Sequence, residues 1–385
     1  MAVTLTDAAL GKLCVDFEYH IPSIVDAIKE EYPEYNVRTD RITSRINRLR
    51  ERGVLPLDSG NYVSSGEILK GSSTLYDEEG NVKLQWVKTD VEKKNQLNIL
   101  KELVDSYVEE LPKFTPRPYT KTYASEDLMA VYPIGDPHIG VLAHKQETGA
   151  DWDLKTAQEV FCGVFDRLIK AAPKCKEATI VNLGDYFHRD NVAGVTERHR
   201  HVLDTDGTYL MMVDTGLKIM IQMINSALEH HEHVKVINML GNHDDTGAMF
   251  LQAALKHMYE NEPRVTIPCT SSVYQYFQHG NTFFGVHHGH TCKPDKLPLV
   301  MATDMPKEWG NAKHRYWLTG HIHHDTRKEY SGCIVESFRT LAGKDNYAHS
   351  GGYRAGQDSK ALVIHKDFGE IERHTINISQ VLNRS

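Results

Sequence analysis

The sequence predicts an α/β fold for its last two thirds, preceded by a small helical unit. From residue 128 onward, short apolar runs alternate with amphipathic stretches of helical length, which is the pattern of strands joined by helices. Before residue 70, three segments with helical spacing and capping residues follow one another closely. We therefore expect a helical domain at residues 1–70, a connecting part at 71–124 and an α/β domain at 125–385.

The composition of the 385-residue chain is that of a globular protein, with 40% hydrophobic and 25% charged residues. A formal net charge of −8 argues against a basic surface over the whole chain, although a local basic patch is compatible with it. The six cysteines include no Cys-x-x-Cys pair, and no signal peptide or apolar run of about 20 residues is present. We expect reduced thiols, a cytoplasmic location and no membrane partner.

The first 70 residues predict three helices. Thr6 caps the first, and the others extend over residues 21–32 and 41–52. Apolar residues of the third helix fall on one face, and four arginines fall on another. Because residues 54–63 could form a hairpin, the unit resembles a winged helix-turn-helix domain, in which the arginine-bearing helix enters the major groove of DNA. The alternative is a solvated charged face. The implied DNA contacts are Arg41, Arg45, Arg48 and Arg52.

The connecting part predicts a hairpin at residues 72–90, an amphipathic helix at 91–111 and a proline-rich linker. The helix would either dock the domains against each other or form a homo-oligomer.

The α/β domain predicts strands that end in potential metal ligands. Strands are expected at 128–134, 178–183, 234–240, 282–286, 316–319, 361–364 and 371–378, with helices at 156–171 and 209–228. The carboxyl ends of parallel strands meet at one edge of a sheet, so we expect the polar residues there to gather. They stand in five motifs: Gly135-Asp136-Pro137-His138, Gly184-Asp185, Gly241-Asn242-His243-Asp244, His287-His288-Gly289-His290 and Gly320-His321-Ile322-His323.

In this order the five motifs resemble those of the calcineurin-like metallophosphoesterase superfamily. The resemblance implies a two-sheet sandwich flanked by helices, and hydrolysis of phosphoric esters by a hydroxide held on two divalent ions, with Mn expected before Fe or Zn. His243 would be the acid–base residue, oriented by Asp244. The implied ligands are Asp136, His138 and His323 for the first ion, Asn242, His288 and His321 for the second, and Asp185 as the bridge.

His188 and Arg189, which follow Asp185 closely in the sequence, point to different substrates. Gly-Asp-x-Phe-His resembles the SbcD-type DNA-repair nucleases, in which the histidine, His188 here, helps to position the phosphodiester. Gly-Asp-Tyr-x-x-Arg resembles the protein phosphatases, in which the arginine, Arg189 here, grips phosphate. The DNA-binding pattern of the helical unit favours a DNA nuclease or phosphodiesterase. The alternative is a phosphatase acting on protein or nucleotide monoesters.

The sequence also bears on partners and origin. No Gly-x4-Gly-Lys-Ser/Thr motif is present, so an ATPase subunit would be a separate chain. A helical DNA-binding unit joined to a phosphoesterase is an arrangement associated with phage-encoded proteins.

Overall fold

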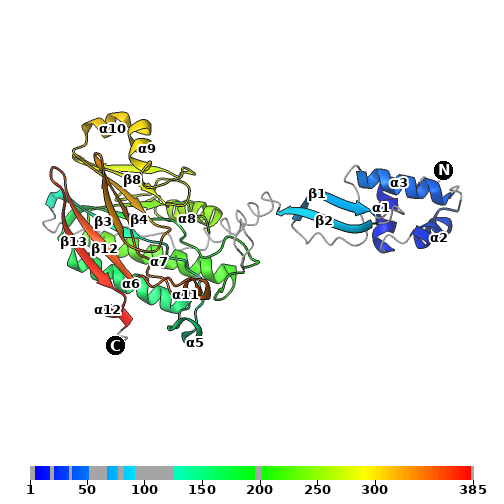
Figure 1. Ribbon diagram of the computed structural model, residues 1–385, viewed down its shortest axis with the longest axis horizontal. Helices are drawn as coiled ribbons and strands as arrows, with labels where there is room; N and C mark the ends of the chain where they lie inside the picture. Colours follow the sequence, from blue (N-terminus) through cyan, green and yellow to red (C-terminus); the bar gives the residue numbers. More distant parts are fainter. Residues whose placement is uncertain are drawn as a thin grey trace. The chain divides into compact units, whose positions relative to one another are not determined.

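The structure is a computed structural model that describes residues 5–17, 21–33, 37–51, 67–76, 82–91, 125–195 and 202–382 (Figure 1). The chain divides into two compact units, Met1–Glu102 and Leu103–Ser385. The predicted wing at 54–63, Arg52, and the predicted helix at 91–111 apart from its first residue lie outside the described residues.

The first unit contains the three predicted helices, α1 (Asp7–Asp16), α2 (Ile21–Glu31) and α3 (Thr39–Glu51). The hydroxyl of Thr6 accepts the amide N–H of Ala9 and so caps α1, as predicted. One apolar face of each helix contributes to a shared core, to which α3 adds Ile42, Ile46 and Leu49. Strands β1 (Glu67–Tyr76) and β2 (Val82–Val91) form the predicted hairpin.

The second unit is built on two sheets. The six-stranded sheet contains β3 (Ser125–Ile134), β4 (Cys175–Asn182), β5 (His233–Asn238), β6 (Val265–Thr266), β12 (Asp358–His365) and β13 (Gly369–Asn377), in the order β13-β12-β3-β4-β5-β6. The five-stranded sheet contains β7 (Gln275–His279), β8 (Thr282–His287), β9 (His314–Thr319), β10 (Thr326–Tyr330) and β11 (Cys333–Ser337), in the order β10-β11-β9-β8-β7. Strands β3 to β6 are parallel to one another, as are β8, β9 and β11.

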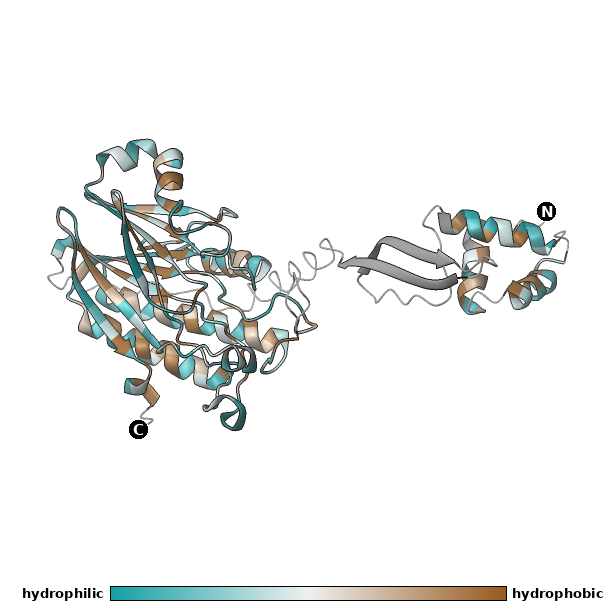
Figure 2. Cartoon of the chain, in the orientation of Figure 1, coloured by the Kyte–Doolittle hydropathy of each residue, from teal (hydrophilic) through white to brown (hydrophobic). Residues whose placement is uncertain are grey.

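A hydrophobic core lies between the two sheets (Figure 2). Alternate residues of the central strands enter it, as expected for side chains that point to opposite faces of a sheet. On the six-stranded side these include Met129 and Val131, and on the five-stranded side Phe284 and Val286. The α/β sandwich predicted from the sequence is therefore confirmed.

Helices cover the outer faces of both sheets. Their bounds are α5 (Lys145–Thr148), α6 (Leu154–Ala171), α7 (Tyr209–His230), α8 (Asp245–Met258), α9 (Leu297–Asp304), α10 (Pro306–Asn311), α11 (Asn346–Ser350) and α12 (Ser379–Leu382). Tyr132 of β3 packs against Phe165 of α6, and Trp317 of β9 shares a core with Met301 of α9. Within the described ranges, no helix combines the length and apolar character needed to cross a membrane.

A polar contact also joins the sheets at the edge where β3 and β4 begin. Nδ1 of His279 on β7 lies 3.4 Å from Oε2 of Glu177 on β4, and Nε2 lies 3.1 Å from the carbonyl oxygen of Asp127 on β3. Only a protonated ring donates to both acceptors. Burial would lower the pKa of His279, but these hydrogen bonds outweigh it and raise the pKa. The hydrogen bond between His279 and Glu177 also lowers the pKa of Glu177.

We predict that Glu177→Gln lowers the melting temperature at pH 6 and has little effect at pH 9. The pair is charged between the lowered pKa of Glu177 and the raised pKa of His279, and its contribution disappears as the pH rises through the latter. We expect a loss on the order of 0.5 kcal/mol, because Glu177 is half exposed. Thermal melts at both pH values measure it.

The control is Glu126→Gln, which removes an exposed pair with Lys176. The lysine stays charged at both pH values, so this variant should show no difference between them. Equal destabilisation of Glu177→Gln at pH 6 and pH 9 would show that the charge of His279 does not join the sheets.

Candidate metal centre

The seven predicted ligands stand at the carboxyl ends of strands from both sheets. Strands β3, β4 and β5 are adjacent and parallel in one sheet, and β8 and β9 are adjacent and parallel in the other. Parallel strands present their carboxyl ends at one edge, so the sandwich brings the ligands to one rim. They are Asp136 and His138 after β3, Asp185 after β4, Asn242 after β5, His288 after β8, and His321 and His323 after β9.

Asp136, His138 and His323 form a first group. Nε2 of His138 lies 3.2 Å from Nε2 of His323, which in turn lies 3.5 Å from Oδ1 of Asp136. Both oxygens of Asp136 accept the amide N–H of His321, at 2.8 and 2.9 Å, and this fixes the carboxylate. The side chain of His323 is 37% exposed, so the group opens to solvent on one side.

Asp185, His288 and His321 form a second group, which Asn242 joins through its Oδ1, 3.1 Å from Nε2 of His288. Oδ2 of Asp185 lies 3.1 Å from the same nitrogen and 4.0 Å from Nε2 of His138 in the first group. Oδ1 of Asp185 accepts the amide N–H of His243 at 2.8 Å. One oxygen of Asp185 therefore faces both groups while the other is held by the main chain, which is the placement a bridging carboxylate requires.

The surroundings of His288 show that these residues fit a cation. Its Nδ1 lies 2.8 Å from the carbonyl oxygen of Leu183, so Nδ1 carries a proton, and its Nε2 faces the oxygens of Asp185 and Asn242. An unprotonated Nε2 and these two oxygens would repel one another, so either a proton on Nε2 or a cation must lie between them. Burial would lower the pKa of His288, but the charge of Asp185 outweighs burial and raises the pKa to about 9. A divalent ion would replace this proton, and mixed oxygen and imidazole donors suit Mn, Fe or Zn.

The turns that present the ligands have backbone conformations that L-amino acids rarely adopt. Such a conformation costs on the order of 1–3 kcal/mol per residue, so the hydrogen bonds of the rim must hold it. A Cβ atom on Gly241 would lie 2.0 Å from Oδ1 of Asp185, so only glycine permits this approach. Among the described residues, the non-glycine residues with positive φ are all predicted ligands: Asp136, His138, Asp185, His321 and His323, with φ from 42° to 71°.

The predicted contact between Asp244 and the imidazole of His243 is wrong. The carboxylate of Asp244 accepts the amide N–H groups of Phe187 and Gly241, at 2.9 and 3.2 Å. Nδ1 of His243 lies instead 3.0 Å from the carbonyl oxygen of His188. Buried amides need acceptors, and Asp244 supplies them to the loops that follow β4 and β5. Asp244 therefore joins the two loops, and a main-chain carbonyl orients His243.

Asp190 belongs to the same arrangement, although the sequence pattern did not predict it. Its oxygens accept the amide N–H groups of Thr246 and Gly247 at 2.8 and 2.7 Å, and this caps the N-terminus of α8. A cap normally comes from the residue that precedes the helix, but the side chain of Asp244 makes no such bond. Local capping patterns cannot reveal a cap supplied from another loop.

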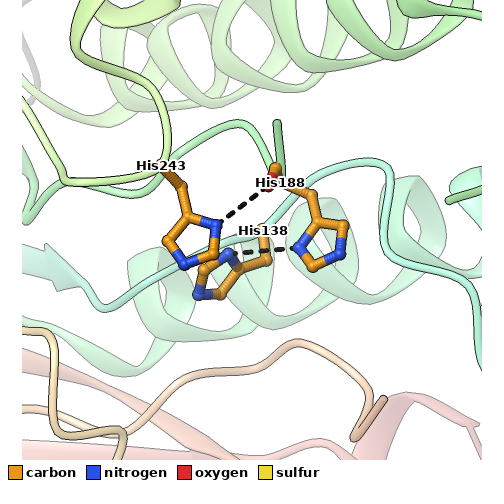
Figure 3. A group of neighbouring side chains, drawn as sticks. All are labelled: His138, His188 and His243. Carbon is orange, nitrogen blue, oxygen red and sulfur yellow. Dashed lines mark hydrogen bonds between the residues drawn. The ribbon is translucent and has the colours of Figure 1, made fainter. Parts of the chain in front are cut away.

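Figure 3 shows His138, His188 and His243 as a group of neighbouring imidazoles. The ring of His188 is nearly parallel to that of His243, at a centroid distance of 5.9 Å, and meets His138 edge-on at 5.4 Å. Only 3% of His188 is exposed, and burial lowers its pKa to about 3, so the ring is neutral at neutral pH. His188 is therefore buried against two histidines of the site, and its predicted contact with substrate stays a prediction.

Arg189 does not have the predicted freedom to grip phosphate. It is 6% exposed, and its Nη1 and Nη2 donate to the carbonyl oxygens of Val192 and Gly207, at 3.3 and 3.0 Å. A planar guanidinium can satisfy two carbonyls at once. Arg189 thus ties the loop after β4 to the segment before α7.

The arginines of α3 in the first unit also differ from the prediction at one position. Arg41 and Arg48 are exposed, as a DNA contact would require. Arg45 donates instead to Oδ1 of Asp7 at 2.7 Å and to the carbonyl oxygen of Leu5 at 2.9 Å. Arg45 therefore joins α3 to the start of α1, and its guanidinium is engaged within the unit.

A comparison with solved structures finds proteins whose backbone trace is similar to part of this chain. No family model and no curated protein matches the chain. Vps29 from Entamoeba histolytica, complexed with Zn²⁺, has 13% identity over 65% of this chain and 99% of that chain, with a TM-score of 0.29. Vacuolar protein sorting 29 from Cryptosporidium parvum has 14% identity over 65% and 97%, with a TM-score of 0.30. An archaeal phosphodiesterase has 15% identity over 65% and 99%, with a TM-score of 0.33.

We predict that Arg189→Lys lowers stability, because a lysine cannot satisfy both carbonyl oxygens. The loss should be on the order of 2 kcal/mol. The kcat/KM values for a small diester and a small monoester should fall by the same factor, since Arg189 shapes the loop without touching either substrate. Thermal melts and kinetics with bis(p-nitrophenyl) phosphate and p-nitrophenyl phosphate measure both effects.

Arg315→Lys is the control, because the guanidinium of Arg315 also donates to several carbonyl oxygens, those of Trp309, Ala312 and Gly332. Arg315 stands at the start of β9 and so away from the rim. This variant should lower stability and leave the kinetics unchanged. If Arg189→Lys instead lost activity only toward the monoester, at an unchanged melting temperature, the result would support direct binding of phosphate by Arg189.

Proposed function

We propose that the chain is a metal-dependent phosphoesterase that hydrolyses phosphodiester bonds of DNA. The placement of Asp185 carries this proposal, because a single oxygen faces two groups of ligands. Two-ion sites that share a carboxylate favour phosphoryl displacement. Asp136, His138 and His323 would hold one ion, and Asn242, His288 and His321 the other, with Mn²⁺ expected before Fe or Zn.

Bound ions would supply hydroxide from water near neutral pH and neutralise charge on the phosphate oxygens. The residues of the chain supply the orientation. The amide of His321 fixes Asp136, the amide of His243 fixes Asp185, and the carbonyl of Leu183 fixes His288. Ligands held in this way by the main chain need little rearrangement when substrate binds.

His243 would act as the acid–base group. Its Nδ1 lies 3.0 Å from the carbonyl oxygen of His188, so Nδ1 carries the proton and Nε2 can exchange one with the ester oxygen. Its ring lies 4.9 Å from that of His138, beside the first group of ligands. His243 is only partly buried, which leaves it accessible to a substrate at the rim.

A diester is proposed because Arg189 is already bound to the carbonyl oxygens of Val192 and Gly207. A dianionic monoester gains most from a bidentate guanidinium, and Arg189 is committed elsewhere. The alternative of a phosphatase rested on this residue and loses that support. DNA is proposed as the polymer because Arg41 and Arg48 are exposed about two turns apart on α3.

A substrate panel with Mn²⁺ tests the activity. We expect hydrolysis of a DNA oligonucleotide and of bis(p-nitrophenyl) phosphate to exceed that of p-nitrophenyl phosphate. Asp185→Asn should lose both metal and activity, because it removes the shared charge. His243→Ala should keep its metal and lose about 10²–10⁴-fold in rate. A preference for the monoester would indicate a phosphatase, and unchanged metal content and turnover in Asp185→Asn would exclude the two-ion centre.

Duplex binding tests the role proposed for the first unit. The double variant Arg41→Ala/Arg48→Ala should bind duplex DNA more weakly and reduce the log–log salt slope by about 0.9 for each phosphate that is no longer bound. Arg45→Ala should lower the stability of the unit and leave the salt slope unchanged while the unit stays folded. An unchanged slope in the double variant would leave α3 as a solvated charged face.

A further inference from the structure

His188 follows Asp185 by three residues and contacts two other histidines of the rim. Its side chain is buried, and its Nδ1 lies 3.5 Å from Nδ1 of His138 (Figure 3). Its carbonyl oxygen lies 3.0 Å from Nδ1 of His243. The side chain and the main chain of this one residue therefore contact two different histidines of the rim.

The contact with His138 concerns the nitrogen that is turned away from the ligand group. Nε2 of His138 faces Nε2 of His323 at 3.2 Å and Oδ2 of Asp185 at 4.0 Å. An imidazole that binds a metal through Nε2 carries its proton on Nδ1, and that N–H almost always donates to a nearby acceptor. His138 is buried, so water cannot readily be this acceptor. The Nδ1 of His188 is in place to accept.

We propose that His188 is a positioning residue for the first metal ion: its Nδ1 accepts the proton of His138 Nδ1 and so aims the Nε2 lone pair of His138 into the ligand group. This role rests on the proposed function, because it requires that the centre binds a metal. It accounts for a histidine that is buried beside a hydrolytic site, since His188 acts through His138 without touching substrate. His243 is oriented by the main chain of residue 188, so a change of the side chain leaves that contact intact.

Two substitutions separate the hydrogen bond from the bulk of the ring. His188→Asn keeps an acceptor close to the position of Nδ1, and His188→Leu fills similar space without one. Metal affinity is measured for each by competition with a chelator, using Mn²⁺ and Zn²⁺. We expect His188→Leu to weaken one of the two sites about 10–100-fold and His188→Asn to stay close to wild type. The same ordering should appear in kcat, with little change in KM.

The matched control is His231→Leu. His231 precedes β5 and so lies at the amino ends of the parallel strands, away from the rim. His231 is equally buried, and its ring contacts the hydroxyl of Tyr132 at 3.0 Å and the carbonyl oxygen of Cys175 at 2.8 Å. This variant should lower the melting temperature without changing metal affinity. It therefore separates the removal of a metal-positioning hydrogen bond from general destabilisation.

The outcomes distinguish this role from the proposed function. A wild-type protein that binds no divalent ion overturns both. A wild type that binds two ions, with His188→Leu unaltered in affinity but impaired on DNA, overturns only the positioning role and assigns His188 to the substrate. Equal loss of affinity in His188→Asn and His188→Leu also overturns it, because the hydrogen-bond acceptor would then be irrelevant.

Discussion

The rim depends on a buried carboxylate, that of Asp185, which must stay ionised where little water reaches it. Burial opposes this charge, but the neighbouring imidazoles, led by His288, outweigh burial and hold the pKa of Asp185 well below its ordinary value. Its Oδ1 is held by the amide of His243, and its Oδ2 faces His288 on one side and His138 on the other. The negative charge of Asp185 is therefore balanced by the imidazoles around it, and a cation placed between the two ligand groups would balance it in the same way.

Polar contacts between loops hold this arrangement against the strain in its backbone. The ligands with positive φ would relax if the loops were free, and each costs on the order of 1–3 kcal/mol. Asp244 holds the amides of Phe187 and Gly241, and Asp190 holds the start of α8. Both acidic side chains are buried. They bind main-chain amides and so hold the loops that carry the ligands.

The strand ends were predictable because each ligand motif follows an apolar run, as β3 (Ser125–Ile134) shows against the prediction of 128–134. The gathering of these side chains at one rim was predictable because the carboxyl ends of parallel strands meet at the same edge of a sheet. The partners of Arg45, Arg189 and Asp244 were not, because each binds main-chain or distant groups that leave no mark in a local pattern. Which charged side chain is free to contact a partner is decided only when the loops and helices pack.

Crystals grown with Mn²⁺ and measured at the Mn absorption edge would locate the ions directly. We expect two anomalous peaks about 3.5–4 Å apart. Oδ2 of Asp185 should lie between them, with Oδ1 still on the amide of His243. A single peak, or Mn²⁺ bound away from Asp185, would contradict a two-ion centre organised by this carboxylate.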